Sequence, residues 1–468
     1  MSQQKMAGET PRSLRFQRKI ALLAGAGMFI DGFDVAVIAV ALPGLRQEWN
    51  ITSGLVSGVV ASAVVLGMFF GMMFGGRLVD KFGRRKMYLF DLLGFVVFAL
   101  AAALTQNVWQ LIAARFMLGL FIGADYPISS SVTAEFTSPK RRGGYIIFMS
   151  LLWQLGAFTA YVTGIVLMQV GDSAWRWMLA VGALLAVIVI IMRHSMPESP
   201  RWLRAQGRDA EADAIERQVF EEHDLVINSG SGVKPASASK GQWRELFSPL
   251  MIRATVFCSV FWFAFAVSFY GIQMYTPTIL GPFTEGRPEL AFLGAALIAA
   301  LGVVGAGIGM FTVERWGRRR QMIWCFVGMV IALVVLALWQ DPTLTFLIVF
   351  LSITILLANL GPGVLNMVYP NEMFPTRLRG TGVGFAGSVS RIGSILGVLV
   401  FPVLVDSWGM ANATWLFAGV AIIGLATAVA LAPETKGRSM EELEELANNG
   451  WRDESGERVV YGNFRKGA

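Results

Sequence analysis

Charged residues stand inside long apolar stretches of this sequence, where charges are rare. The string Asp31-Gly32-Phe33-Asp34 has apolar residues on both sides, and Arg115 and Asp125 stand in a later apolar stretch. A charge at the middle of a bilayer costs at least ~2.5 kcal/mol, so each is a candidate for function. Asp31 and Asp34 are three residues apart and share a helix face. Two carboxyl groups so close discourage each other's ionisation. The pattern predicts a site that binds and releases protons.

Arg115 needs a counter-charge inside the membrane, and Asp34 is the candidate. A pair that opens when the acid is protonated would couple a proton to a movement. The alternative is a fixed buried ion pair that serves packing alone. Asp125 has two interpretations as well, a place in the site or a hydrogen bond between helices. Asp91 is expected to be structural.

Arg391 stands about ten residues into another apolar stretch, and no acid is near it in the sequence. The guanidinium fork binds both oxygens of a carboxylate, which makes an unpaired arginine in a cavity a good receptor for an organic acid. The alternative is a pair with an acid of the other half of the chain, or with backbone carbonyl groups.

The elements that must position these residues are membrane-spanning helices. Hydrophobic residues make up 55% of the chain and charged residues 15%, against roughly 25% charged in an average soluble domain. Apolar runs of about 20 residues predict spanning helices. Twelve are expected, over 20–45, 54–78, 87–106, 109–136, 144–169, 175–194, 252–281, 291–313, 321–339, 343–372, 381–405 and 413–432. The predicted fold class is therefore an all-α integral membrane protein.

Basic residues gather in alternate loops, which predicts that both termini and the central polar stretch lie in the cytoplasm. These residues are Arg12, Arg15, Arg18 and Lys19, then Lys81, Arg84, Arg85 and Lys86, then Lys140, Arg141 and Arg142, then Arg315, Arg318, Arg319 and Arg320, and then Arg377 and Arg379. They account for the net charge of +7. A nucleic-acid partner is not needed to explain it.

Three short strings occur twice at a nearly constant offset, which indicates a duplicated unit of about half the chain. Residues 80–86 return as 314–320, 135–143 as 372–380, and 197–199 as 433–435. A carboxylate at the repeated turns, Asp80 or Glu314, can accept hydrogen bonds from helix-end N–H groups and pair with an arginine across the halves. The expected units are a terminus over 1–19, a bundle over 20–195, a linker with short helices over 196–250, a bundle over 251–433 and a tail over 434–468.

Glycines recur at every fourth position in three of the expected helices. Small residues at this spacing allow close helix packing in lipid. We expect a packing role, with a direct role in sliding between conformations as the alternative. The residues are Gly67, Gly71 and Gly75, then Gly305 and Gly309, and then Gly393 and Gly397.

The repeated strings resemble the loop signatures of the major facilitator superfamily, and the residues from Arg115 to Arg142-Gly143 resemble the fourth-helix signature of its sugar-porter and metabolite–proton symporter branches. The resemblance covers about 20–440. It implies two pseudo-symmetric six-helix bundles and a central site that opens to each side in turn. It also implies a cytoplasmic gate, for which the candidate residues are Asp80, Arg84, Arg85, Glu135, Arg142, Glu198, Arg201, Glu314, Arg318, Glu372, Arg379 and Glu434.

The same resemblance implies that Asp34 and Arg115 form a proton-coupling pair. Aromatic-acid–proton symporters have a similar Asp-Gly-aromatic-Asp string and a similar arginine in the eleventh helix. The sugar-porter pattern is broken at Val267, Ser268 and Leu365, where two glutamines and a tryptophan would be expected. These departures favour a small organic acid over a sugar. The candidate substrate-binding residues are Arg391, Gln154, Gln273, Tyr275, Tyr126 and Asn366.

The expected function is a proton-coupled symporter that imports a small organic acid, aromatic acids included, by alternating access. The proton would be carried by Asp31, Asp34 or Asp125 together with Arg115. A sugar or polyol symporter is the main alternative; a proton-antiport efflux pump and a nutrient sensor are less favoured. We expect no enzyme activity, no metal and no cofactor other than protons. We expect a monomer in the cytoplasmic membrane.

Overall fold

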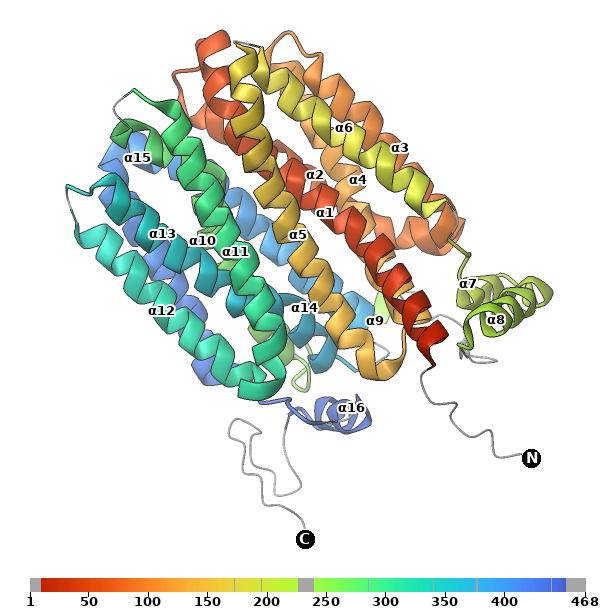
Figure 1. The fold of residues 1–468 in the computed structure, drawn as a ribbon. Coiled ribbons are helices and arrows are strands. Elements are labelled where there is room, and N and C mark those ends of the chain that lie inside the picture. Colours follow the sequence, from red (N-terminus) through yellow and green to blue (C-terminus); the bar gives the residue numbers. More distant parts are fainter. Residues whose placement is uncertain are drawn as a thin grey trace.

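The computed structural model describes residues 10–171, 173–194, 196–225, 240–284, 286–339, 341–375, 378–438 and 440–451. All regular elements in these ranges are helices. The first half of the chain forms α1 to α6 and the second half α10 to α15, and the two sets lie side by side in Figure 1.

The first bundle contains α1 (Pro11–Glu48), α2 (Gly54–Phe82), α3 (Arg84–Ala103), α4 (Val108–Phe136), α5 (Pro139–Leu167) and α6 (Ala174–Arg193). The second contains α10 (Ile252–Leu280), α11 (Pro288–Trp316), α12 (Arg318–Leu338), α13 (Leu344–Leu360), α14 (Pro362–Met373) and α15 (Arg379–Leu431).

The second bundle differs from the expected series of helices at two places. The expected tenth span is divided into α13 and α14 at Gly361, whose backbone angles are not helical. The expected eleventh and twelfth spans form the single element α15, and the chain turns between them at Gly409 with φ 80° and ψ 166°. Glycine readily adopts a positive φ. Gly409 alone therefore makes the turn between the two spans, where the polar residues nearby suggest a longer loop. Eleven described segments are long and apolar enough to cross a membrane, and α15 is one of them.

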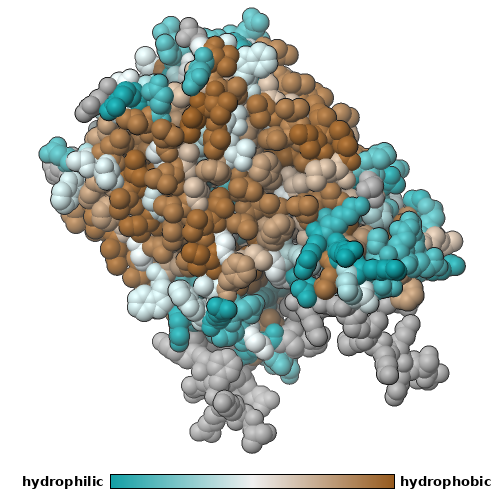
Figure 2. Space-filling view, in the orientation of Figure 1, coloured by the Kyte–Doolittle hydropathy of each residue, from teal (hydrophilic) through white to brown (hydrophobic). Residues whose placement is uncertain are grey.

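The wall of the helical body is apolar, as a membrane requires. Figure 2 shows a broad hydrophobic surface between two hydrophilic ends. Large side chains of the spanning helices, such as Trp109, Ile191 and Phe311, are about 70% exposed. Surface of this kind is stable against lipid and costly against water.

One end of the molecule carries the short helices and is here called the linker end. It holds α7 (Pro200–Ala205), α8 (Asp209–His223), α9 (Lys240–Glu245), α16 (Met440–Asn448) and the start of α1 (Figure 1). The other end is called the opposite end. The predicted cytoplasmic location applies to the linker end.

Glycines bring helix backbones into direct contact within each bundle. A Cβ atom at Gly67 of α2 would overlap the carbonyl oxygen of Phe116 in α4, and one at Gly305 of α11 would overlap that of Leu356 in α13. A Cβ atom at Gly307, two residues along the same helix, would meet nothing within 4 Å. The glycine stripes therefore pack helix against helix, as their spacing indicates.

Gly305→Ala is expected to destabilise the protein, because the added methyl group meets backbone that cannot move aside. Overpacking of this kind costs about 1–3 kcal/mol. Gly307→Ala is the matched control, since it adds the same methyl group to open space and restricts the unfolded chain by about 0.4–1 kcal/mol. Thermal unfolding in detergent should show a lower midpoint for Gly305→Ala alone. Equal midpoints for the two variants would contradict the packing role.

Candidate functional site

A pocket lies between the two bundles, and residues of both bundles line it. Spaces between the helices of bundles are common sites for small ligands. Seven of the lining residues come from the first bundle and ten from the second, so movement of one bundle against the other would reshape the pocket. They are Met28, Tyr126, Ile146, Met149, Ser150, Trp153 and Gln154 from the first bundle, and Trp262, Phe265, Phe269, Tyr270, Ala306, Asn359, Gly363, Asn366, Met367 and Arg391 from the second.

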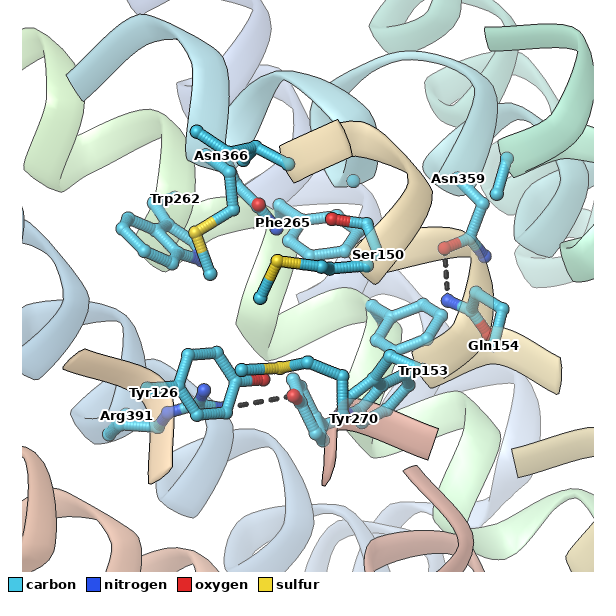
Figure 3. A pocket seen from close by; sticks show the side chains of 17 residues that line it. Tyr126, Ser150, Trp153, Gln154, Trp262, Phe265, Tyr270, Asn359, Asn366 and Arg391 are labelled. Carbon is cyan, nitrogen blue, oxygen red and sulfur yellow. Dashed lines mark hydrogen bonds between the residues drawn. The ribbon is translucent and has the colours of Figure 1, made fainter. Parts of the chain in front are cut away.

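Arg391 is the charged residue of this wall, and only 3% of it is exposed. Its Nη1 donates to the hydroxyl of Tyr270 at 2.9 Å, and its Nε lies 3.4 Å from the sulfur of Met72. Its guanidinium lies 5.0 Å from the ring centre of Tyr126 (Figure 3). No carboxylate among the described residues forms an ion pair with it. The group is oriented by two tyrosines and keeps its positive charge uncompensated at contact distance.

Three amide side chains also line the pocket, those of Gln154, Asn359 and Asn366. Gln154 of α5 donates a hydrogen bond to Asn359 of α13, and this bond crosses between the bundles (Figure 3). The break at Gly361 follows two residues after Asn359 and lets α14 start in a new direction. Asn366, on α14, therefore lines the same pocket as Asn359. Three amides can together donate to and accept from a polar ligand.

Four of the six predicted substrate-binding residues line the pocket: Tyr126, Gln154, Asn366 and Arg391. Gln273 and Tyr275 do not. The backbone oxygen of Gln273 accepts a hydrogen bond from Tyr161 of the other bundle, and the ring of Tyr275 packs on Phe401. Both lie farther along α10 toward the opposite end, which corrects their placement in the pocket. Trp262, Phe265 and Ser150 were missed, because apolar and small residues of a spanning helix carry no sequence signal that separates pocket from packing.

The predicted ion pair between the first and fourth spans is present. Nη1 of Arg115 lies 3.5 Å from Oδ2 of Asp34, and its Nη2 donates to the backbone oxygen of Asp34 at 3.0 Å. The side chains are 0% and 1% exposed. The pair lies in the first bundle, among α1 and α4, and neither residue lines the pocket. Because the Asp34–Arg115 pair is sealed from solvent, the two side chains can separate only if a proton reaches Asp34 or the helices of the bundle move.

Asp125 takes a partner that the sequence did not reveal. Nη1 of Arg193, at the end of α6, donates to Asp125 Oδ1 at 3.0 Å, and the hydroxyl of Ser129 donates to Oδ2 at 3.0 Å. Asp31 interacts electrostatically with Asp125, Arg193 and Arg391, and its Oδ2 has no hydrogen-bond donor. Asp31 and Asp34 therefore act in different surroundings although they share a helix.

At the linker end, two glutamates close the starts of two helices in the same way. Glu198 accepts from the backbone N–H groups of Arg84 and Arg85 at the start of α3, and Glu434 accepts from those of Arg318 and Arg319 at the start of α12. A carboxylate is stabilised there by free N–H groups and the helix dipole.

This arrangement corrects the expected role of the acids at the turns. Glu314 does not accept hydrogen bonds from the backbone N–H groups of α12. Its Oε1 instead pairs with Nη2 of Arg318 at 2.7 Å. The side chain of its counterpart Asp80 lies outside the described residues, as does that of Arg142. Gly83 and Gly317 have φ of 91° and 88°, and a Cβ atom on either would press on Glu198 or Glu434.

The main ion pairs at the linker end stay within one bundle each. Arg84 pairs with Glu135 at 2.9 Å, and Arg318 pairs with Glu372 at 3.1 Å. Neither pair joins the two halves in this structure, and the gate role of these residues stays a prediction. Of the remaining gate candidates, Arg201 interacts electrostatically with Glu135, and Arg379 with Glu444 of α16.

The bundles approach each other closely toward the opposite end. A Cβ atom at Gly54 or Gly58 of α2 would press on Asp406 or on the backbone of Leu399 in α15. At Gly143 and Gly380, near the linker end, it would meet nothing within 4 Å. In this structure the two bundles are thus packed together, α2 against α15, toward the opposite end.

The pocket between paired bundles, the repeated helix caps and the buried acid–arginine pair occur together in a chain that a known family model matches. That model is described as "Sugar (and other) transporter" and matches residues 20–447. The chain belongs to this family. It is a multi-pass membrane transporter of the major facilitator superfamily, in the sugar-porter branch, and the predicted family and fold class are confirmed. Family and fold are those of transporters rather than enzymes.

Relatives in this family match over almost their whole length. The inner membrane metabolite transport protein YgcS of Escherichia coli K12 is 32% identical over 424 residues, which are 90% of this chain and 92% of the relative. The arabinose-proton symporter of Bacillus subtilis 168 is 28% identical over 454 residues, 93% of this chain and 96% of the relative. A solved structure of the proton:xylose symporter XylE, with 6-bromo-6-deoxy-D-glucose bound, has a TM-score of 0.77 at 20% identity and covers 93% of this chain and 99% of its own. This last likeness concerns the fold.

Proposed function

We propose that this transporter is a proton-coupled symporter that imports a small organic acid through the cytoplasmic membrane, with the linker end inside the cell. The observation that carries the proposal is Arg391, a buried guanidinium in the pocket wall held by Tyr270 and Tyr126 and unpaired with any described carboxylate. A carboxylate ligand supplies the missing charge in bidentate geometry. Trp153 and Phe269, whose ring centres are 6.0 Å apart, offer faces against which an aromatic acid could stack.

In the proposed cycle, Asp34 or Asp31 takes a proton from outside, and protonation of Asp34 weakens its attraction to Arg115. The substrate carboxylate binds Arg391 in the pocket. The two bundles then rock against each other about the pocket, and the opposite end closes. Substrate and proton leave at the linker end. The close packing of α2 on α15 toward the opposite end supports an inward-facing state at this stage.

A sugar or polyol is the second candidate, and the comparisons favour it over an acid. Relatives include an arabinose-proton symporter and a glucose transporter of Staphylococcus epidermidis, the latter 26% identical over 436 residues. The amides of Gln154, Asn359 and Asn366 are groups that hydrogen-bond hydroxyls well. In this case Arg391 would remain paired with the two tyrosines and leave the ligand to the amides.

Uptake by proteoliposomes with an imposed pH gradient, acidic outside, separates the two candidates. The probes are radiolabelled 4-hydroxybenzoate, succinate, xylose and glucose. Empty liposomes correct for acids that cross lipid unaided. Accumulation of either acid beyond this control supports the proposal. Accumulation of a sugar alone establishes the second candidate, and uptake that ignores the gradient overturns proton coupling.

A further inference from the structure

The pocket wall carries more hydrogen-bonding groups than a simple carboxylate can use. Besides Arg391, Ser150 of α5 and Asn366 of α14 line the pocket, and neither side chain forms a hydrogen bond within the described residues. Trp153, also in the wall, is only 7% exposed. Its indole Nε1 is buried and meets no acceptor in the described part of the chain. Because a buried donor without an acceptor is costly, we expect a polar group of the ligand beside it.

The Gln154–Asn359 pair also keeps hydrogen-bonding capacity for a ligand. Nδ2 of Asn359 donates to the backbone oxygen of Ile355 at 2.9 Å, and its Oδ1 accepts from Nε2 of Gln154. The Oε1 atom of Gln154 receives no donor from the residues that the structure describes. A carboxylate only accepts hydrogen bonds, whereas a hydroxyl group both donates and accepts. Hydroxyl groups are therefore the ligand groups that can satisfy Gln154 as well as Trp153 and Asn366.

These uncharged groups and Arg391 surround the same aromatic residues. Arg391 donates to the hydroxyl of Tyr270, whose ring centre lies 5.9 Å from that of Trp153. Gln154 follows Trp153 directly in α5. In Figure 3, Tyr270 and Trp153 lie between Arg391 and the Gln154–Asn359 pair. Since all five residues line one pocket, a single ligand can contact the guanidinium and the hydroxyl-binding groups together.

The aromatic part of the wall suits a saturated ring that carries hydroxyl groups at its edge. The ring centres of Trp153 and Phe269 are 6.0 Å apart, and Phe265 stacks on Phe269 at 5.1 Å. Aromatic faces carry partial negative charge and attract the C–H groups of a ring that lies against them. A pyranose ring has C–H groups on its faces and hydroxyl groups around its edge, so it complements a wall of aromatic faces and amides.

We propose that this pocket takes a polyhydroxylated carboxylate, that is, a sugar acid. The carboxylate forms charge-assisted hydrogen bonds with Arg391. The hydroxyl groups bind Gln154, Asn366 and the indole N–H of Trp153. The inference rests on the proposed function, which it narrows from organic acids in general to this class. One ligand then uses both parts of the wall, whereas a plain acid leaves the amides unused and a neutral sugar leaves the guanidinium unused.

Three ligands that share a six-membered ring test the proposal on wild-type protein in detergent. D-Glucuronate has both the carboxylate and the hydroxyl groups, cyclohexanecarboxylate has the carboxylate alone, and D-glucose has the hydroxyl groups alone. The change in tryptophan fluorescence gives each Kd, since Trp153 and Trp262 line the pocket. D-Glucuronate is expected to bind at least about 10-fold more tightly than either of the others, because each of those leaves one part of the wall without partners.

The outcomes separate this inference from the proposed function. Equal affinities for cyclohexanecarboxylate and D-glucuronate would overturn the inference and leave the proposed import of an organic acid standing. Equal affinities for D-glucose and D-glucuronate would overturn both, because Arg391 would then contribute nothing as a receptor for carboxylates. Binding of D-glucose without binding of either acid would likewise reject both.

A matched pair of asparagines on α14 tests the contacts with the hydroxyl groups. Asn366→Leu removes an amide from the pocket and keeps a side chain of similar size. It should weaken binding of D-glucuronate by about 2- to 10-fold and leave that of cyclohexanecarboxylate unchanged. Asn371→Leu is the control, because Asn371 is not among the residues that line the pocket and donates to the backbone oxygen of Met367 at 2.7 Å. It should leave both affinities unchanged. An affinity for D-glucuronate that Asn366→Leu leaves intact would overturn the assigned contacts.

Discussion

Arg391→Gln is expected to weaken binding of 4-hydroxybenzoate by roughly 10- to 150-fold, because a charge-assisted hydrogen bond contributes about 1.5–3 kcal/mol and each 1.4 kcal/mol is a factor of ten. Glutamine keeps a polar group of similar reach and removes the positive charge. The affinity of Arg391→Lys for 4-hydroxybenzoate should lie between those of wild type and Arg391→Gln, since a lysine ammonium keeps the charge and lacks the bidentate fork.

Quenching of tryptophan fluorescence measures this binding, since Trp153 and Trp262 both line the pocket. Two tyrosines of α10 give a matched control. Tyr270→Phe removes the hydroxyl that holds Arg391 and should weaken binding, while Tyr275→Phe removes a hydroxyl that lies outside the pocket and should not. An affinity for the acid that Arg391→Gln leaves intact would make the arginine structural and favour the sugar candidate.

Asp34→Asn is expected to abolish accumulation of substrate driven by a pH gradient. The variant removes the group that takes the proton and leaves Arg115, 0% exposed, with no counter-charge. Breaking a buried pair by loss of one partner destabilises by about 3–5 kcal/mol. The variant should therefore also unfold at a lower temperature, and both effects are measurable on the same preparation.

The double variant Asp34→Asn/Arg115→Gln separates stability from coupling. With both charges gone, no unpaired charge remains, so the thermal midpoint should recover toward that of wild type. Accumulation driven by the pH gradient should remain absent. A double variant that accumulates substrate as wild type does would show that the pair serves packing alone.

The helical architecture could be predicted from the sequence, because each spanning helix needs a long apolar run. Duplicated strings at 80–86 and 314–320 also indicated two related halves. The joint at Gly409 could not be predicted. Polar residues around it resemble a loop, and only the backbone shows that one glycine with positive φ makes the turn.

The candidate site was predictable where a charge had to be explained. Asp34, Arg115 and Arg391 are conspicuous because each is costly in an apolar run. Arg193 is not conspicuous, since at the end of α6 it has the appearance of a basic residue that flanks a span. Its role depends on Gly27 and Asp125, which are distant in sequence and meet only in the packed bundle.

Gln273 shows a different limit. Trp262, Phe265 and Phe269 follow one another at helical spacing along the pocket side of α10, and Gln273 continues that stripe by one turn. The sequence gives the face of the helix but not the height at which the pocket ends. That height is set by Tyr161, which reaches across from α5 and covers the next turn.

The hydrogen bond between Gln154 and Asn359 has a consequence for which compounds are carried and which only block. This bond joins the bundles at the pocket wall, so a ligand that lies beside it leaves the two bundles free to rock against each other about that joint. A ligand bulky enough to part the two amides instead wedges the bundles at a fixed spacing. Tight binding and rapid passage are then separate properties, and large analogues of the substrate are expected to act as inhibitors that never reach the other side.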